Sequence, residues 1–147
     1  MNGDLHALVE QRVRAAGQRY TVGRRDLVER MRDAGQPVSA PELLERAPRL
    51  PQSSAYRNLA VLEQAGVVHR IVANGDFARF ELAEDLTEHH HHLICSRCGR
   101  VEDVTVPSDL EGTLDRTLDR LAKRAGFADV DHRLDLIGTC ADCARRG

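Results

Sequence analysis

The sequence predicts an α+β chain in two parts: an N-terminal winged helix-turn-helix domain followed by a small C-terminal α/β domain. Three observations lead to this prediction. Helical patterns fill residues 5–65, two strand-like runs then flank an Asn-Gly pair, and a stretch rich in histidine and cysteine follows at residues 89–99. We therefore expect a winged-helix domain at residues 1–82, a hinge at 83–88, and a metal-binding dimerisation domain at 89–147.

The composition is that of a globular, soluble chain, with 41% hydrophobic and 30% charged residues. No apolar run approaches the roughly 18 residues that a membrane span needs. The polar segment from Met1 to Arg14 is not typical of a secretory signal, so we expect a cytoplasmic protein. Residues 1–75 hold 11 arginines against 8 acidic residues, which weakly favours an anionic partner for this half.

Four helices and a hairpin account for the N-terminal part. Apolar spacing predicts helices at residues 5–15 and 24–34. A capping box, Ser39-Ala40-Pro41-Glu42, opens a short helix, and a further helix follows from residue 52 or 53 to Ala65. Strands at 67–72 and 77–82 flank an Asn-Gly hairpin signal at Asn74. The alternative is a three-helix packing module without a DNA partner.

The last of these helices presents a polar face of Ser53, Tyr56, Arg57 and Asn58. Arginine and asparagine can form paired hydrogen bonds with base edges, and tyrosine and serine suit phosphates or a thymine methyl group. Together with the short capped helix before it, this face favours double-stranded DNA as a partner. We expect phosphate contacts from Arg19, Arg24 and Arg25, although a merely solvated polar face would have a similar composition.

The cysteines occur only as two C-x-x-C pairs: Cys95, Cys98, Cys140 and Cys143. In a reducing compartment such pairs indicate a tetrahedral thiolate zinc site more than disulfides. A long loop between the pairs is compatible with this, because closure entropy grows slowly with loop length. The sequence therefore predicts structural Zn²⁺, with a redox dithiol as the competing interpretation.

Four consecutive histidines, His89 to His92, precede the first pair. In an extended strand successive side chains alternate between two faces, so His89 and His91 point one way, and His90 and His92 the other. Such a strand cannot gather four imidazoles on one metal ion, but it can contribute two ligands to each of two sites. A solvated histidine patch is the alternative.

Each site needs ligands from elsewhere. His69 and Glu81, on the two predicted wing strands, could reach the His90/His92 face, and His132, in a predicted strand at 131–137, the His89/His91 face. Candidate carboxylates for the second site are Glu111, Asp115 and Asp103, and Ser108-x-x-Glu111 also forms a capping box that competes for Glu111. The residues alone leave this choice open.

The C-terminal part is expected to contain strands at 89–95, 100–106 and 131–137, and a helix from Pro107-Ser108 to Ala125 with its leucines inward. So small a sheet has little core and exposed edges. Pairing with a second copy relieves both problems, and a homodimer also suits two recognition helices on two half-sites.

Nearly the whole chain resembles the ferric uptake regulator family. The matching segments are Arg19-Tyr20-Thr21-x-x-Arg24, Ser53 to Leu62 with Gly66-Val67-Val68, Phe80-Glu81-Leu82, His89 to Gly99, and Gly138-x-Cys140-x-x-Cys143. The resemblance implies a homodimeric, metal-activated repressor of metal-homeostasis genes, with Tyr56 and Arg57 in the recognition helix and structural zinc at the four cysteines.

The resemblance also implies two further sites. Carried over by position, the sensing site is His69, Glu81, His90 and His92, and the second site is His89, His91, His132 and either Glu111 or Asp115. Pro37, preceded by Gln36, stands where iron- and peroxide-sensing relatives often have a hinge histidine. His69 stands where zinc-sensing relatives have an acidic ligand, and is expected to substitute for it. The expected regulatory metal is Fe²⁺ or Zn²⁺, with Mn²⁺ and Ni²⁺ compatible with the same donors.

Three other functions compete with this interpretation. A peroxide sensor would use the same site with iron that oxidises a ligand histidine. A thiol-disulfide switch would use the C-x-x-C pairs. A metallohydrolase needs an open coordination position and a general base, and the sequence has no His-Glu-x-x-His helix, so an enzyme is not expected.

Overall fold

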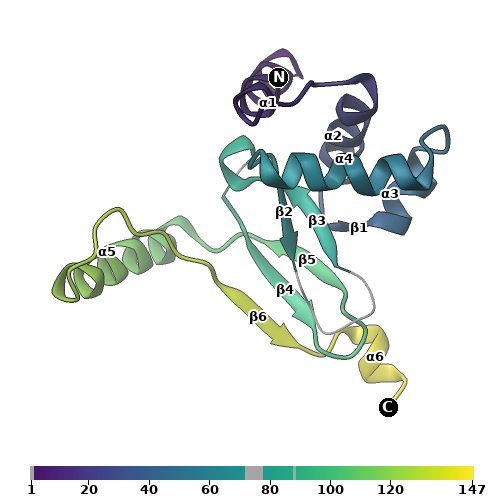
Figure 1. Cartoon of the computed structure of the whole chain (residues 1–147). Coiled ribbons are helices and arrows are strands. Elements are labelled where there is room, and N and C mark those ends of the chain that lie inside the picture. Colours follow the sequence, from purple (N-terminus) through teal and green to yellow (C-terminus); the bar gives the residue numbers. More distant parts are fainter. Residues whose placement is uncertain (1, 72–77, 88) are drawn as a thin grey trace.

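The computed structural model describes residues 2–71, 78–87 and 89–147 (Figure 1). Two three-stranded sheets organise the chain, one in each half. The predicted Asn74-Gly75 turn, with Val72 and Phe77 at the strand ends, lies outside the described residues. Within the described residues, no helix is both long enough and apolar enough to cross a membrane.

Helices dominate the N-terminal half. They are α1 (Asn2–Ala15), α2 (Val22–Ala34), α3 (Ala40–Arg46) and α4 (Gln52–Gln64). Helix α2 begins two residues before the predicted start because the Thr21 hydroxyl caps it, accepting from the Arg24 amide at 3.3 Å. It ends at Gly35, which adopts φ = 64°.

The capping box at Ser39 is only half formed. Ser39 Oγ accepts from the Glu42 amide at 3.3 Å, as expected. The Glu42 carboxylate does not reach back, but instead accepts from Arg79 at 2.7 Å. The first turn of α3 is thereby tied to the wing.

The wing sheet has the order β1-β3-β2 and is antiparallel. Strands β2 (Val68–Ile71) and β3 (Arg79–Leu82) are the two predicted wing strands, and the short β1 (Val38–Ser39) was not predicted. The register places His69 opposite Glu81. Apolar residues from α1 to α4 and the wing form one core that includes Val13, Leu27, Leu59 and Phe80.

The short 3-10 helix η1 (Glu84–Leu86) leads into the second sheet, whose order is β5-β4-β6. Strand β4 (His91–Cys95) pairs antiparallel with β5 (Val101–Val104) and parallel with β6 (Asp135–Gly138). Strand β6 is shorter than predicted, and His132 lies before it. The chain closes with α6 (Ala141–Arg145), which was not predicted.

Helix α5 (Ser108–Arg124) departs most from expectation. Its leucines were expected to point inward, but none of its residues is buried, and it projects away from the sheet (Figure 1). Leu110 and Leu121 are 47% and 54% exposed. The predicted helix is present, but the prediction that its leucines point inward is wrong for the described residues.

Candidate metal centres and nucleic-acid face

Three groups of potential metal ligands occur among the described residues, and in each group the ligand atoms lie within 4.8 Å of one another. Two of the groups take alternate histidines of the run, as strand alternation predicts. The groups are Glu81/His90/His92/Asp103, called here the hinge group; His89/His91/Glu111/His132, called the second group; and the four cysteines.

The hinge group joins the two halves of the chain through Glu81, which lies on β3 of the wing. Its Oε2 is 3.0 Å from Nε2 of His90, and its Oε1 is 2.8 Å from Nε2 of His92. Asp103 on β5 lies directly beside His92 in the sheet register, with Oδ1 3.7 and 3.8 Å from the same two nitrogens. One ion at this point would contact both halves.

His69 was expected in this group and lies outside it. It lies opposite Glu81 in the β2–β3 register and lines the same cleft. The fourth potential ligand within 4.8 Å of the others is Asp103. It had been considered only for the second site, because nothing in the local sequence reveals that β5 lies beside β4.

Burial and charge interactions within the hinge group shift the pKa values of its potential metal ligands. Burial alone would raise the pKa of Glu81, but hydrogen bonds and charge interactions with His92 and His90 lower it below the ordinary value. Burial and the neighbouring Glu81 charge raise the pKa of Asp103. The hydrogen bond that His92 donates to Glu81 raises the pKa of His92. A cation would take the place of the proton held between these groups.

In the second group, three imidazoles converge on Glu111. Its oxygens lie 2.7 Å from His89 Nε2, 2.8 Å from His91 Nε2 and 2.6 Å from His132 Nε2. Burial opposes ionisation of Glu111, but the hydrogen bonds with these histidines outweigh it and lower the pKa to about 2. The predicted capping box is absent: Pro107 is the N-cap of α5 and no side chain caps the helix, so the Glu111 carboxylate is available to the histidines.

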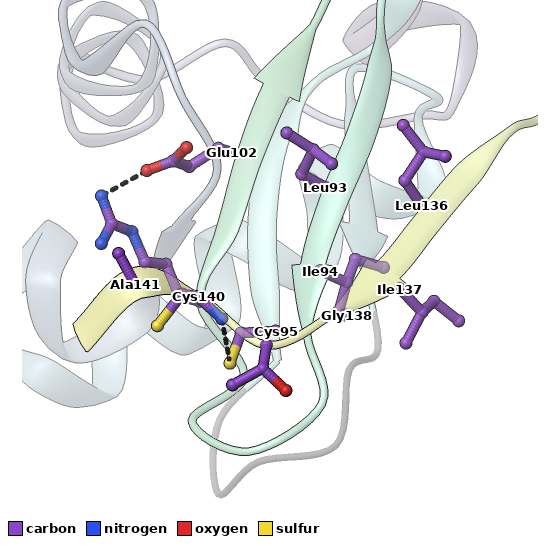
Figure 2. A pocket seen from close by; sticks show the side chains of 11 residues that line it. Leu93, Ile94, Cys95, Glu102, Leu136, Ile137, Gly138, Cys140 and Ala141 are labelled. Atoms are coloured by element: carbon purple, nitrogen blue, oxygen red, sulfur yellow. Dashed lines mark hydrogen bonds and ion pairs between the residues drawn. The ribbon is translucent and has the colours of Figure 1, made fainter. Parts of the chain in front are cut away.

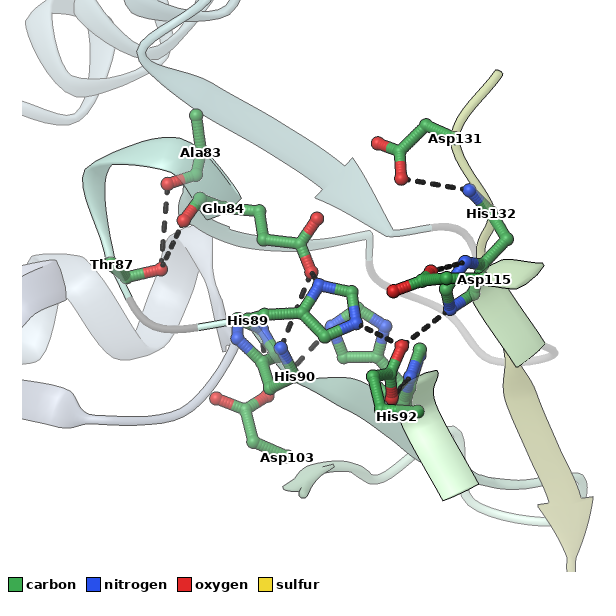
Figure 3. Close-up of polar contacts among 12 residues, drawn as sticks. Ala83, Glu84, Thr87, His89, His90, His92, Asp103, Asp115, Asp131 and His132 are labelled. Carbon is green, nitrogen blue, oxygen red and sulfur yellow. Dashed lines mark hydrogen bonds and ion pairs between the residues drawn. The ribbon is translucent and has the colours of Figure 1, made fainter. Parts of the chain in front are cut away.

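Asp115 contributes differently. Its Oδ1 lies 3.2 Å from Nδ1 of His132 (Figure 3), whereas Glu111 contacts Nε2 of the same ring. The two acids left open by the sequence thus take different positions: Glu111 lies among the histidines, and Asp115 lies behind one of them.

Carboxylates support two further ligand histidines in the same way. Asp135 lies 3.4 Å from Nδ1 of His92, and Glu84 contacts Nδ1 of His89 (Figure 3). A carboxylate that accepts a hydrogen bond from Nδ1 fixes the tautomer and leaves the Nε2 lone pair for a metal ion. None of these supporting contacts was predicted, because they join segments that are distant along the chain or separated by the hinge.

The four thiols fit a tetrahedral ion. Cys98 Sγ and Cys140 Sγ are 3.8 Å apart, and Zn–S bonds of 2.3 Å in a tetrahedron imply a separation of about 3.8 Å. Hydrogen bonds from the backbone of Cys140 and Cys98 lower the pKa of Cys95 to about 6, whereas contact with Cys140 and burial raise that of Cys143 to about 12. Figure 2 shows Cys140 donating its amide to Cys95 Sγ, at 3.3 Å.

The predicted DNA-binding residues divide into two kinds. Arg19, Ser53, Tyr56 and Arg57 are exposed. Asn58 is half-buried, and its Oδ1 accepts from Nε of Arg24 at 3.1 Å. Arg24, proposed for phosphate contact, is only 8% exposed and also donates to the carbonyl of Arg19. Arg24 and Asn58 thus link α2 to α4 inside the domain.

Comparison with known proteins decides the family. The model of the "Ferric uptake regulator family" matches residues 15–137. The chain belongs to this family. It is 33% identical to the ferric uptake regulation protein of Neisseria meningitidis over 105 residues, which are 71% of this chain and 68% of that protein. It is 29% identical to the peroxide operon regulator of Bacillus subtilis over 99 residues, covering 67% and 63% of the two chains.

The solved structures agree with this family fold. The Helicobacter pylori ferric uptake regulator superposes with a TM-score of 0.73 at 20% identity, covering 98% of this chain and 94% of that one. As a ferric uptake regulator family protein, the chain is a metal-responsive, DNA-binding transcriptional regulator, and this family does not consist of enzymes. Its four-cysteine group is consistent with structural zinc, and its His/Glu groups are consistent with a regulatory metal.

Proposed function

We propose that this protein represses metal-homeostasis genes by binding operator DNA as a homodimer when a divalent ion, Fe²⁺ first and Zn²⁺ second, occupies the hinge group. In this proposal residues 1–82 bind DNA, 83–88 form the hinge and 89–147 dimerise. Zn²⁺ at the four cysteines is structural, and His89, His91, Glu111 and His132 form a second site.

One observation carries the proposal: Glu81 on the wing lies within 3.0 Å of both His90 and His92 at the start of the C-terminal half. An ion held by these residues would restrict how the wing, and with it α4, is oriented relative to the dimerisation half. Metal then favours the DNA-competent arrangement to the extent that it binds that arrangement more tightly.

The donor set supports iron over zinc. Two imidazoles with two carboxylates offer mixed nitrogen and oxygen ligands, which suit non-haem Fe²⁺ and Mn²⁺, whereas closed zinc sites most often use cysteine and histidine in a tetrahedron. Pro37 supplies no further imidazole. His69 is not part of the group as described, so we propose that Asp103 rather than His69 completes it.

A second copy is the partner that the exposed apolar surface fits. Leu93, Leu136 and Ile137 are 41%, 44% and 70% exposed on β4 and β6, and Figure 2 shows Leu93 and Leu136 on neighbouring strands. The leucines of α5 are uncovered as well, and exposed apolar side chains that gather in this way are typical of a protein–protein interface. Burial of this surface against its symmetry mate would supply the missing core.

The test is operator binding measured by fluorescence anisotropy on the protein's own promoter, with each divalent ion at a buffered free concentration. We expect Fe²⁺ to increase the affinity of the native protein. His90→Ala/His92→Ala should remain a folded dimer and lose this increase, while His69→Ala should retain it. Equal operator binding by the double variant with and without a chelator would overturn the proposal.

Peroxide sensing is a second candidate, favoured by the similarity to the Bacillus subtilis peroxide operon regulator. In that function Fe²⁺ in the hinge group and peroxide together would add oxygen to a ligand histidine. Peptide mass spectrometry after treatment with Fe²⁺ and peroxide distinguishes the two. A gain of one oxygen on His90 or His92 supports peroxide sensing, and unmodified histidines exclude it.

A further inference from the structure

Two adjacent residues of η1 make contacts in opposite directions. Asp85 faces the N-terminal half, where the guanidinium of Arg12 on α1 donates to both of its carboxylate oxygens, Nη1 to Oδ1 at 3.2 Å. Nη1 of Arg12 also donates to the carbonyl of Gly66 at 2.9 Å, just beyond the end of α4. The same arginine thus joins the hinge to the end of the proposed recognition helix.

Glu84 faces the C-terminal half. Its Oε1 accepts from the backbone amide of His90 at 3.3 Å and contacts Nδ1 of His89 (Figure 3). The other nitrogen of His89, Nε2, lies 2.7 Å from Glu111 within the second group. Glu84 is therefore the hinge residue that contacts the Nδ1 side of His89, a proposed metal ligand.

We propose that Glu84, Asp85 and Arg12 form a connector that couples occupancy of the second group to the position of α4. The inference rests on the proposed function, because it assigns a regulatory role to the second site of that same repressor. It makes Glu84 and Arg12 positioning residues that contact neither DNA bases nor the ion.

The physical basis is the position of the His89 ring. It contacts Glu84 through Nδ1 and Glu111 through Nε2, so an ion bound at Nε2 would hold the ring between these two carboxylates. A carboxylate behind a metal-bound imidazole orients the ring, and the ring in turn orients the carboxylate. Occupancy of the second group would thereby fix the contact that anchors η1.

The other end of the connector is more than an isolated surface ion pair. Exposed pairs contribute little because solvent screens them and side-chain entropy is lost. Arg12, however, makes a two-point contact with Asp85 and a third hydrogen bond to Gly66, and its side chain is 29% exposed. Three contacts from one planar guanidinium fix the direction of η1 relative to α4.

The first experiment compares two arginines of the same helix. Arg12→Gln removes the connector, and Arg14→Gln removes one equal charge from α1, where Arg14 pairs only with Glu10 at 2.8 Å among the described residues. Operator affinity is measured at saturating Fe²⁺ and with a chelator too weak to extract the cysteine-bound zinc. We expect the metal-induced gain to be at least fivefold smaller in Arg12→Gln than in Arg14→Gln, within the range of ordinary allosteric coupling.

The second experiment isolates the second group and does not use DNA. In the His90→Ala/His92→Ala background, the second group is the remaining His/Glu site, and amide hydrogen exchange is followed over residues 83–87. Metal should slow exchange there, and adding Glu84→Gln should abolish that slowing, while Glu102→Gln, an acid on β5 outside all three groups, should not. A double-mutant cycle should show that Arg12→Gln and Glu84→Gln are not additive.

The outcomes separate the inference from the function on which it rests. If metal does not change operator affinity in the native protein, the proposed function fails, and the connector fails with it. If metal does increase that affinity, but Arg12→Gln behaves like Arg14→Gln or Glu84→Gln keeps the metal-induced protection, only the connector is overturned. If Arg12→Gln lowers the stability of the protein, Asp85→Asn removes the partner of the same contact, and the metal-induced gain in operator affinity is measured on that variant instead.

Discussion

Oε1 of Glu81 lies 2.8 Å from Nε2 of His92, so the wing and the second sheet meet at two atoms of kinds that bind metal ions in proteins. Burial leaves the side chain of Glu81 only 11% exposed. A carboxylate in such a position is stabilised by a partner of opposite charge, which is a protonated imidazole without metal and a cation with it.

Glu81→Ala should therefore weaken metal binding at the hinge group by more than tenfold, since even residues behind a metal ligand change affinity by 10- to 100-fold. The measurement is a titration against a competing chromophoric chelator. Glu63→Ala is the matched control, because Glu63 precedes the wing and pairs only with Arg70, at 3.2 Å, among the described residues. Equal affinities for the two variants would exclude Glu81 as a ligand.

The metal-free protein should lose stability in acid through Glu111. Its pKa is lowered from 4.5 to about 2, so its contribution to the free energy of unfolding is fully present above pH 4.5 and is lost as the pH falls toward 2. Urea unfolding between pH 5 and pH 3 should show stability that falls with pH, and Glu111→Gln should flatten that slope. An unchanged slope would mean that the histidines do not hold the Glu111 charge.

Loss of the structural zinc should destabilise the C-terminal half. Cys140→Ser removes one thiolate from the group, and structural zinc contributes directly to folding free energy. We expect the melting temperature to fall by at least about 10 °C, since several kcal/mol are lost and each shifts Tm by a few degrees. Ser96→Ala in the same region, losing only a 3.2 Å hydrogen bond to Gly138, is the control and should shift it far less.

Ile137→Glu should convert the dimer to a monomer. Ile137 is 70% exposed, and a symmetric interface would bury it twice, at roughly 1.5–3 kcal/mol per apolar side chain. The dimer dissociation constant, measured by sedimentation, should rise at least 100-fold. Val22→Glu, at a position 86% exposed on the N-terminal half, should leave it unchanged.

Arg57→Ala should lower operator affinity, whereas Asn58→Ala should lower the free energy of unfolding. Arg57 is exposed, so its loss should weaken operator binding without altering the free energy of unfolding. Loss of Asn58 leaves Nε of the buried Arg24 without its acceptor and should cost about 1–3 kcal/mol of stability. Chemical unfolding and anisotropy on the same samples separate the two effects. A stability loss in Arg57→Ala would contradict this division.

The local sequence pattern was enough to predict features that depend on residues close together in the chain. The alternation of His89 to His92, the C-x-x-C pairs and the boundaries of α3 and α4 all follow from periodicity or capping. Contacts between residues that are far apart in the sequence could not be predicted in this way. Asp103 reaches the hinge group through the β4–β5 register, and the choice between Glu111 and Asp115 depends on how α5 is placed.

The leucines of α5 show a further limit. Helical periodicity indicates that a face must be covered, but not by which molecule. The apolar face of α5 was therefore predicted, but the prediction that this face packs inward was wrong. His69 lies opposite Glu81 in the wing register but outside the group of potential ligands, so its role as a ligand stays a prediction.

The run of four identical side chains at the start of β4 has a consequence for its own alignment. A shift of one residue exchanges the faces of a strand, yet here it would still present histidine at most positions of both groups. The tract therefore cannot set its own register. That task falls to the buried residues that follow it: Ile94, which pairs with Val101 on one side and Ile137 on the other, and Cys95, which pairs with Gly138. The alignment of both histidine groups therefore depends on the end of the strand that carries no histidine.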